Sequence, residues 1–203
     1  MKLESIIKKG ALCVLFFFCV NLQANFVLQN DNILQPELVA QLEGMGSELY
    51  QKTGVNLSVA VVESLQDKSL SDKANEFRAN LKSPYIFLIF TNKEHKIQIY
   101  NTENTQDLFD KERILSPMPN RGSIIPILVN HKRDANMTGV INAAILNGYA
   151  DIADQVAKSQ GIELETSIGD TNRIFVNTIR YIFYGTLVFA LFMYFYSRKK
   201  KKQ

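Results

Sequence analysis

The C-terminal end of the chain constrains its fold most, because it carries a long segment without a charged side chain. The segment spans residues 181–196 and is followed by five consecutive positive charges at 198–202. As a helix it would be about 25 Å long at about 1.5 Å per residue, near the lower limit for a bilayer, and residues 174–180 can extend it. Every face is apolar, unlike a helix buried in a soluble domain. We therefore predict a transmembrane helix over 174–197 and a basic cytoplasmic tail over 198–203.

The N-terminal end has the layout of a secretory signal. Three lysines within the first nine residues precede an apolar run over 11–20, and Ala24 offers a small residue for cleavage before Asn25. We predict a signal peptide over 1–24, with an uncleaved N-terminal anchor as the alternative. Both cysteines, Cys13 and Cys19, lie in this segment. The mature chain would then have no disulfide and no cysteine metal ligand.

Charge places the residues between these two segments on the outer side of the membrane. Basic residues flank membrane segments on the cytoplasmic side, so we expect a single-pass protein of the bacterial inner membrane with its main domain in the periplasm. Residues 25–172 hold 13 basic and 19 acidic side chains, a net charge of −6. An acidic domain without a basic stripe argues against nucleic-acid binding. The polar stretch 161–173 is predicted to link the domain, residues 25–160, to the membrane.

Hydrophobic periodicity predicts an α/β fold for the domain. Leu38, Leu42, Met45 and Leu49 recur at helical spacing between Pro36 and Gly54. Short apolar runs rich in β-branched or aromatic residues are typical of buried strands. We predict strands over 57–62, 85–90 and 96–100, and helices over 36–53, 70–81, 106–115 and 137–156. Elements in this order form a small mixed sheet sandwiched by helices.

Several short motifs in this order resemble the TPM domain family of extracytoplasmic modules. They are Asp31 before the helix start at Pro36-Glu37, Thr53-Gly54 before an apolar strand, the Glu94-His95 turn, and Ile124-Ile125-Pro126 before the last helix. The chain departs from the family pattern after the hairpin, where residues 100–104 lack both glycines. Because glycine permits close backbone approach, a ligand pocket built from those loops would be reshaped here.

The resemblance implies a non-catalytic accessory module that assists assembly, stability or repair of a membrane protein complex. The partner complex is not identified by the sequence, and the bilayer is contacted through the C-terminal helix. The alternative is a metal-dependent, phosphatase-like hydrolase, since phosphatase activity has been attributed to some TPM relatives. We find no nucleophile elbow, phosphate-binding loop or zinc-binding helix motif in the chain, so the sequence favours the accessory module.

Charged residues near loops are the candidates for ligand or metal binding. If acids near loops converge at one end of the sheet, where α/β folds bind ligands, such a cluster outside the cytoplasm would suit Ca²⁺. For each acid, however, we favour a solvated surface charge or a residue at a helix N-terminus. His95 and His131 are too far apart for a metal-ligand motif and are interpreted as two exposed loop residues. The candidates are Asp31, Glu94, His95, Glu103, Asp107 and Asp110.

A glycosylation motif precedes the last predicted helix. Asp134-Ala135-Asn136-Met137-Thr138 is a sequon with an acid two residues before the asparagine, as in the extended acceptor of bacterial N-glycosylation systems. The alternative role of Asn136 is helix capping. Asn56-Leu57-Ser58 is a second sequon, but it enters a predicted buried strand and lacks the acid.

Overall fold

A four-stranded sheet in the order β1-β2-β3-β4 organises the computed structural model, which describes residues 25–132, 134–167, 184 and 186. The strands are β1 (Val27–Asn30), β2 (Asn56–Val62), β3 (Tyr85–Thr91) and β4 (Lys96–Asn101). β1, β2 and β3 are parallel, whereas β4 is antiparallel to β3. The predicted mixed sheet is confirmed. Its edge strand β1 was not predicted, because four residues are too few to show a periodic pattern.

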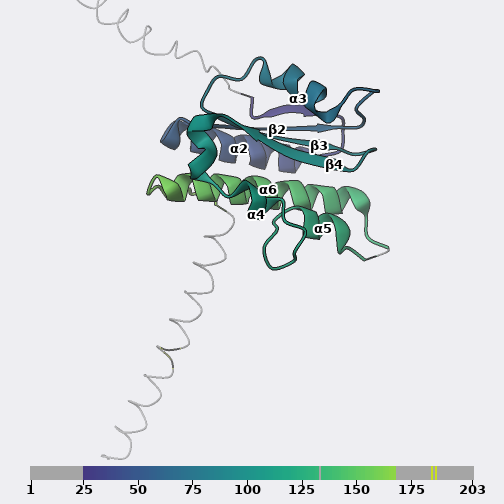
Figure 1. Ribbon diagram of the computed structural model, residues 1–203. Coiled ribbons are helices and arrows are strands. Elements are labelled where there is room, and N and C mark those ends of the chain that lie inside the picture. The colour runs from purple at the N-terminus through teal and green to yellow at the C-terminus, as the bar shows by residue number, and fades with distance from the viewer. Residues whose placement is uncertain (1–24, 133, 168–183, 185, 187–203) are drawn as a thin grey trace, which may run out of the picture.

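Helices cover both faces of this sheet. α2 (Pro36–Thr53) and α6 (Met137–Ser159) lie on one face, and α3 (Leu70–Arg78) lies on the other (Figure 1). Alternate strand residues divide between two apolar clusters: Leu88 packs with α2 and α6, whereas Phe87 packs with α3. Because successive side chains of a strand point to opposite faces, β3 needs apolar residues at every position. The predicted sandwich of helices around a small sheet is confirmed.

Helix α6 is locked to the sheet by one side chain. Tyr149 is fully buried, and its hydroxyl donates a hydrogen bond of 2.7 Å to the carbonyl oxygen of Leu57 in β2. The ring crosses α2 at Gly46, where an added Cβ would lie 2.5 Å from the Tyr149 hydroxyl oxygen. A residue without a side chain at 46 therefore allows α2 and α6 to pack closely on the sheet.

The segment between β4 and α6 differs from the prediction. The helix predicted over 106–115 is two separate pieces, the 3₁₀ helix η1 (Glu103–Leu108) and α4 (Lys111–Ile114). Phe109 separates them because it adopts an extended conformation, φ −154° and ψ 154°, that buries its side chain. A further short helix, α5 (Ile125–Val129), was not predicted. Helices this short lack the repeated turns that a periodicity argument needs.

The first part of the predicted linker belongs to the packed domain. Leu164 and Ser167 are buried, and Glu48 of α2 accepts hydrogen bonds from the backbone N–H groups of Glu165 (2.6 Å) and Thr166 (2.9 Å). The domain therefore continues to Ser167 and does not end at the predicted boundary of 160.

The other predicted segments lie outside the described residues. These are the signal peptide, the rest of the linker, the basic tail and, apart from Tyr184 and Thr186, the segment 174–197. Within the described ranges, no helix has both the length and the apolar character needed to cross a membrane. The transmembrane helix remains a prediction from the sequence.

Candidate functional site

Two of the predicted acids lie where the parallel strands end. Asp31 follows β1, and Glu94 lies in the turn between β3 and β4. Asp31 Oδ2 accepts a hydrogen bond of 2.8 Å from the backbone N–H of Glu63. Glu94 Oε1 accepts bonds from the Ser64 hydroxyl (2.8 Å) and the Leu65 N–H (3.0 Å). Both carboxylates thus hold the loop that follows β2.

One carboxylate oxygen of Glu94 takes no part in these contacts. Its Oε2 atom is buried and accepts no hydrogen bond from the described part of the chain. The backbone N–H of Leu65 and then the hydroxyl of Ser64 stabilise the charged carboxylate, so the pKa of Glu94 is lowered from its ordinary value. Glu94 is therefore ionised at neutral pH and has one acceptor atom to offer.

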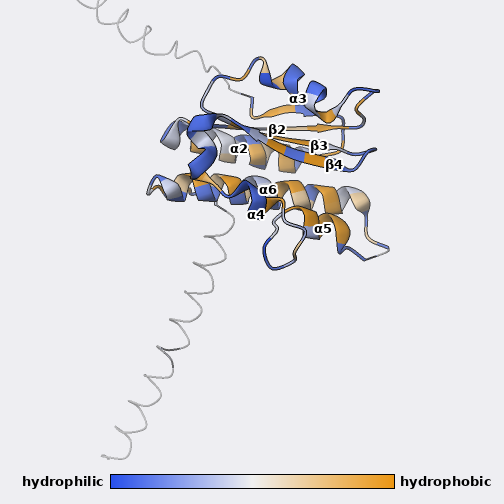
Figure 2. Ribbon diagram, in the orientation of Figure 1, coloured by the Kyte–Doolittle hydropathy of each residue, from blue (hydrophilic) through white to orange (hydrophobic). Residues whose placement is uncertain are grey.

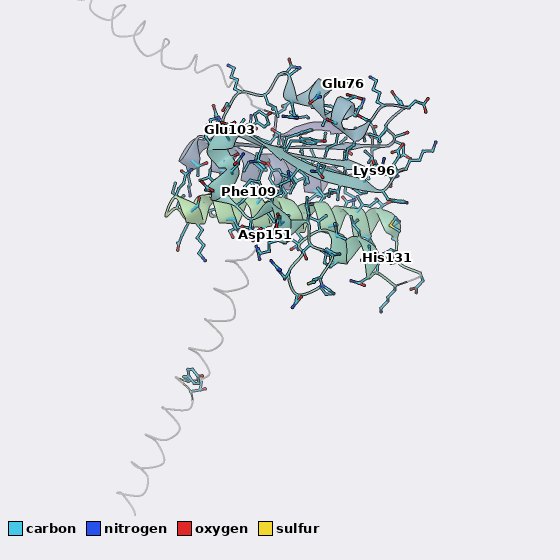
Figure 3. The ribbon with its side chains drawn as sticks, viewed as in Figure 1. Glu76, Lys96, Glu103, Phe109, His131 and Asp151 are labelled. Atoms are coloured by element: carbon cyan, nitrogen blue, oxygen red, sulfur yellow. The ribbon has the colours of Figure 1, made fainter. Side chains whose placement is uncertain are left out.

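The remaining predicted acids lie elsewhere. β4 runs antiparallel to β3, so Glu103 in η1 is carried to the opposite end of the sheet from the turn before Lys96 (Figure 3). Asp107 also lies in η1, and Asp110 caps α4 by accepting the Arg113 N–H at 2.8 Å. These acids do not all converge at one end of the sheet, because the reversal of β4 separates them. In the described ranges, no three acidic, histidine or cysteine side chains form a group able to hold a metal ion.

The two histidines, by contrast, meet at one pocket. His95 from the β3–β4 turn and His131 from the loop after α5 both line a cavity of about 350 Å³. The other lining side chains are aliphatic or aromatic and come from β3, β4, α5 and α6: Phe90, Ile97, Ile125, Leu128, Val129, Met137 and Ile141. His95 is exposed, whereas His131 is half-buried, with its Nδ1 3.0 Å from the Leu128 carbonyl oxygen. Both histidines lie outside helices and strands, as interpreted from the sequence, and only His131 is less exposed than expected. The sequence did not show that they share a pocket.

The position of α5, which forms one wall of the pocket, is fixed at its N-terminal end. Ile124 is fully buried against Gly148 of α6, where an added Cβ would lie 2.2 Å from its side chain. The Asn147 side chain donates to the Ser123 carbonyl at 2.8 Å, and Asp151 binds the Ser123 hydroxyl and the Arg113 guanidinium. Hydrophobic residues continue to the other end of α5 (Figure 2), where Val129 is 60% exposed.

Charged residues of both signs flank the two histidines of the pocket in the sequence. Lys96 follows His95 and Lys132 follows His131, and both lysines are exposed. The nearby acid Glu94 is turned towards Ser64 and Leu65, and Asp134 stands exposed in the loop before α6. An apolar pocket with exposed lysines next to its two histidines suits a ligand that is apolar at its centre and carries negative charge where it meets those lysines.

One solved structure of low sequence identity shares this fold. The solution structure of the N-terminal domain of a protein from P. gingivalis superposes with a TM-score of 0.52 at 11% identity, covering 70% of this chain and 88% of that one. The BA42 protein from Bizionia argentinensis gives a TM-score of 0.45 at 13% identity, covering 68% and 95%. No curated protein matches the sequence.

A family model provides the assignment that the fold alone does not. The model described as the TPM domain matches residues 27–155, which is more than half of the chain. The matched region runs from β1 to the last turns of α6, so it includes the sheet, both helical layers and the apolar pocket. The resemblance found in the sequence motifs is confirmed, and the chain belongs to the TPM domain family.

Proposed function

We propose that this protein is a membrane-tethered periplasmic interaction module that assists the assembly, stability or repair of a membrane protein complex. The observation that supports it best is the apolar pocket between the β3–β4 turn, α5 and α6. Two of its side chains remain accessible, since Val129 is 60% and Met137 41% exposed. Single exposed apolar residues are ordinary, but neighbouring ones around a preformed pocket are typical of a binding site.

The occupant that fits this surface is an acidic segment of a partner protein that inserts an apolar side chain. The pocket volume of about 350 Å³ is ample for one large side chain, whose burial contributes about 1.5–3 kcal/mol. Acidic residues next to that anchor would pair with Lys96 and Lys132, the exposed lysines that follow the lining residues His95 and His131. Charge complementarity of this kind increases association rates and disfavours wrong partners.

The predicted tether contributes to such binding without adding a contact. Holding the domain and a membrane-embedded partner at one membrane surface raises their effective concentration. A modest interface then suffices, as expected for an accessory protein that associates with a complex and leaves it.

Capture of partners from solubilised membranes tests the proposal. The full-length protein carries an affinity tag, and the recovered proteins are quantified for wild type, Val129→Glu and Met118→Glu. Met118 is a matched control because it is 56% exposed but does not line the pocket. We expect a membrane protein that is enriched by wild type and Met118→Glu and lost with Val129→Glu. Equal recovery with both variants would exclude the pocket as the docking site.

The second candidate function is a metal-dependent, phosphatase-like hydrolase. One observation supports it, the buried Glu94 Oε2 atom that has no hydrogen-bond donor in the described part of the chain. A cation beside Glu94 would satisfy its buried Oε2, which otherwise lacks a partner. Ca²⁺ takes six to eight oxygen ligands, and the described residues do not supply a comparable group. The residues present therefore fit a metal incompletely.

Calorimetric titration of Ca²⁺, with wild type and Glu94→Gln compared, tests this candidate. Saturable binding that is lost in Glu94→Gln, together with phosphatase turnover, would favour the hydrolase over the interaction module. Absence of binding would remove Ca²⁺ from the account.

A further inference from the structure

The sequon at Asn136 lies where an exposed loop of the folded domain enters the first turn of α6. The loop connects α5 to α6 at the periphery of the molecule, next to the labelled His131 (Figure 3). Asp134, Asn136 and Thr138, the three residues that an extended bacterial acceptor needs, are all exposed. The acceptor motif is therefore displayed on the surface, as transfer to a folded chain requires.

The side-chain amide of Asn136 forms a hydrogen bond through its oxygen, and its nitrogen remains available for reaction. Asn136 caps α6, and its Oδ1 accepts a hydrogen bond of 3.1 Å from the backbone N–H of Thr138. In the described part of the chain, no hydrogen bond involves Nδ2 of this residue. Nδ2 is the atom that reacts in N-glycosylation. The capping role and the acceptor role thus use different atoms of one side chain, and they are compatible.

We propose that Asn136 is the acceptor for an oligosaccharide transferred from a lipid-linked pyrophosphate donor at the outer face of the membrane. A bond forms between Nδ2 and the anomeric carbon of the oligosaccharide, and the bond from that carbon to the pyrophosphate oxygen breaks. The amide gives up one proton as the lipid pyrophosphate leaves. The proposal relies on the predicted export of the domain. Met137, the middle residue of the sequon, also lines the pocket, so a glycan at Asn136 would stand beside the proposed docking site.

Presenting the acceptor in an extended form requires little rearrangement. Only Met137 and Thr138, the first residues of α6, need to leave the helix, and both are exposed together with Gly139. The buried contacts that anchor α6 to the domain begin later, at Ile141 in the core and at Asn142, which accepts the Gln35 N–H at 2.8 Å and donates to the Ile33 carbonyl at 2.9 Å. Opening the first turn breaks one further bond of Asn142, its donation to the Thr138 carbonyl at 2.6 Å. Helix ends fray readily, so the first turn can open while the fold persists.

The second sequon of the chain is an internal comparison. Asn56 begins β2, a central strand of the sheet, and the residue two positions before it is Gly54. Ser58 is fully buried, and its hydroxyl donates to Asn56 Oδ1 at 2.5 Å. Glycosylation of Asn56 in the folded domain would require removal of β2 from the sheet. The fold therefore selects one of the two sequons.

The test expresses the full-length chain in a bacterium that has a lipid-linked oligosaccharide and an active N-oligosaccharyltransferase. An otherwise identical strain with an inactive transferase is the control. An exposed acceptor pentapeptide inserted before Asn25 reports, in the same molecule, that the chain was exported and met the enzyme. Gel mobility and mass spectrometry of the peptide that contains Asn136 measure occupancy.

We expect one glycan at Asn136 in wild type and in Ser58→Ala, and none there in Asn136→Asp or Thr138→Ala. Asp134→Asn should lower occupancy of Asn136 strongly, because it removes the acid that the extended bacterial acceptor requires and leaves the rest of the sequon intact. Asn136→Asp retains a side-chain oxygen for the cap, so an unchanged melting temperature separates loss of the acceptor from loss of folding. An unmodified Asn136 in chains whose inserted pentapeptide is glycosylated would overturn the proposal. Transfer to Asn56 in place of Asn136 would also overturn it.

Discussion

Replacing Glu48 with glutamine tests how the domain holds the segment that leads away from its last helix. The carboxylate of Glu48 accepts hydrogen bonds from Lys52 (2.7 Å), from the N–H groups of Glu165 and Thr166, and from the Thr166 hydroxyl. Burial raises the pKa of Glu48, but these donors together outweigh burial and lower the pKa from 4.5 to about 2. The charged carboxylate is thus bound more strongly in the folded chain than in the unfolded one.

The size of the effect follows from that difference in pKa. At about 1.4 kcal/mol per pKa unit, the full difference corresponds to about 3 kcal/mol. The flanking side chains of Lys52 and Glu165 are 34% and 92% exposed, so solvent screens the interaction and we expect about 1–2 kcal/mol. Because the folded pKa lies below the unfolded one, this stabilisation is present above about pH 4.5 and is lost as the pH falls towards 2.

Urea denaturation of the fragment 25–167, followed by far-UV circular dichroism between pH 7 and pH 2, measures the effect. We expect Glu48→Gln to lower the free energy of unfolding by about 1–2 kcal/mol at pH 7 and the difference from wild type to shrink towards pH 2. Glu165→Gln is the matched control, because it removes a charge from the same corner but makes only a 4.0 Å contact with Lys52. A Glu48→Gln variant as stable as wild type at pH 7, or a difference that persists at pH 2, would refute the reasoning.

Three further substitutions test the packing that positions the pocket. Tyr149→Phe removes the donor to the Leu57 carbonyl and should lower the free energy of unfolding by about 1–2 kcal/mol, measured by urea denaturation. Gly148→Val places a side chain against Ile124 and should cost about 1–3 kcal/mol; an unchanged melting temperature would argue against the close approach of α5 and α6. Asp151→Ala releases the loop before α5, so limited proteolysis should cleave residues 116–122 faster than in wild type, and equal rates would contradict the anchoring role.

Elements with long-range periodicity were predictable from the sequence. α2 and α6 show apolar residues at helical spacing, and the uninterrupted apolar run of β3 predicts its burial on both faces. β1 and α5 were missed because four or five residues carry too little pattern. The break at Phe109 was missed because one residue, extended to bury its ring, interrupts an otherwise helical composition.

The candidate site depended on tertiary structure more than the fold did. The reversal of β4 sends Glu94 and Glu103 to opposite ends of the sheet, and the residues themselves do not show which acids then remain neighbours. The pocket brings together residues 90–97 and 125–141, which become adjacent only when α5 folds onto α6. One feature of the sequence indicated the pocket wall, the dense run of apolar residues over 124–129. A loop fully exposed to solvent would not contain so many apolar residues.

Site-specific photo-crosslinking at position 129 is the most direct test of the interaction module. A photoreactive amino acid replaces Val129 in the full-length protein in its membrane, and a second variant carries it at Met118, which is exposed but outside the pocket. We expect a discrete crosslink to one membrane protein from position 129 and none to that protein from position 118. Crosslinks of equal yield from both positions, or from neither, would contradict it.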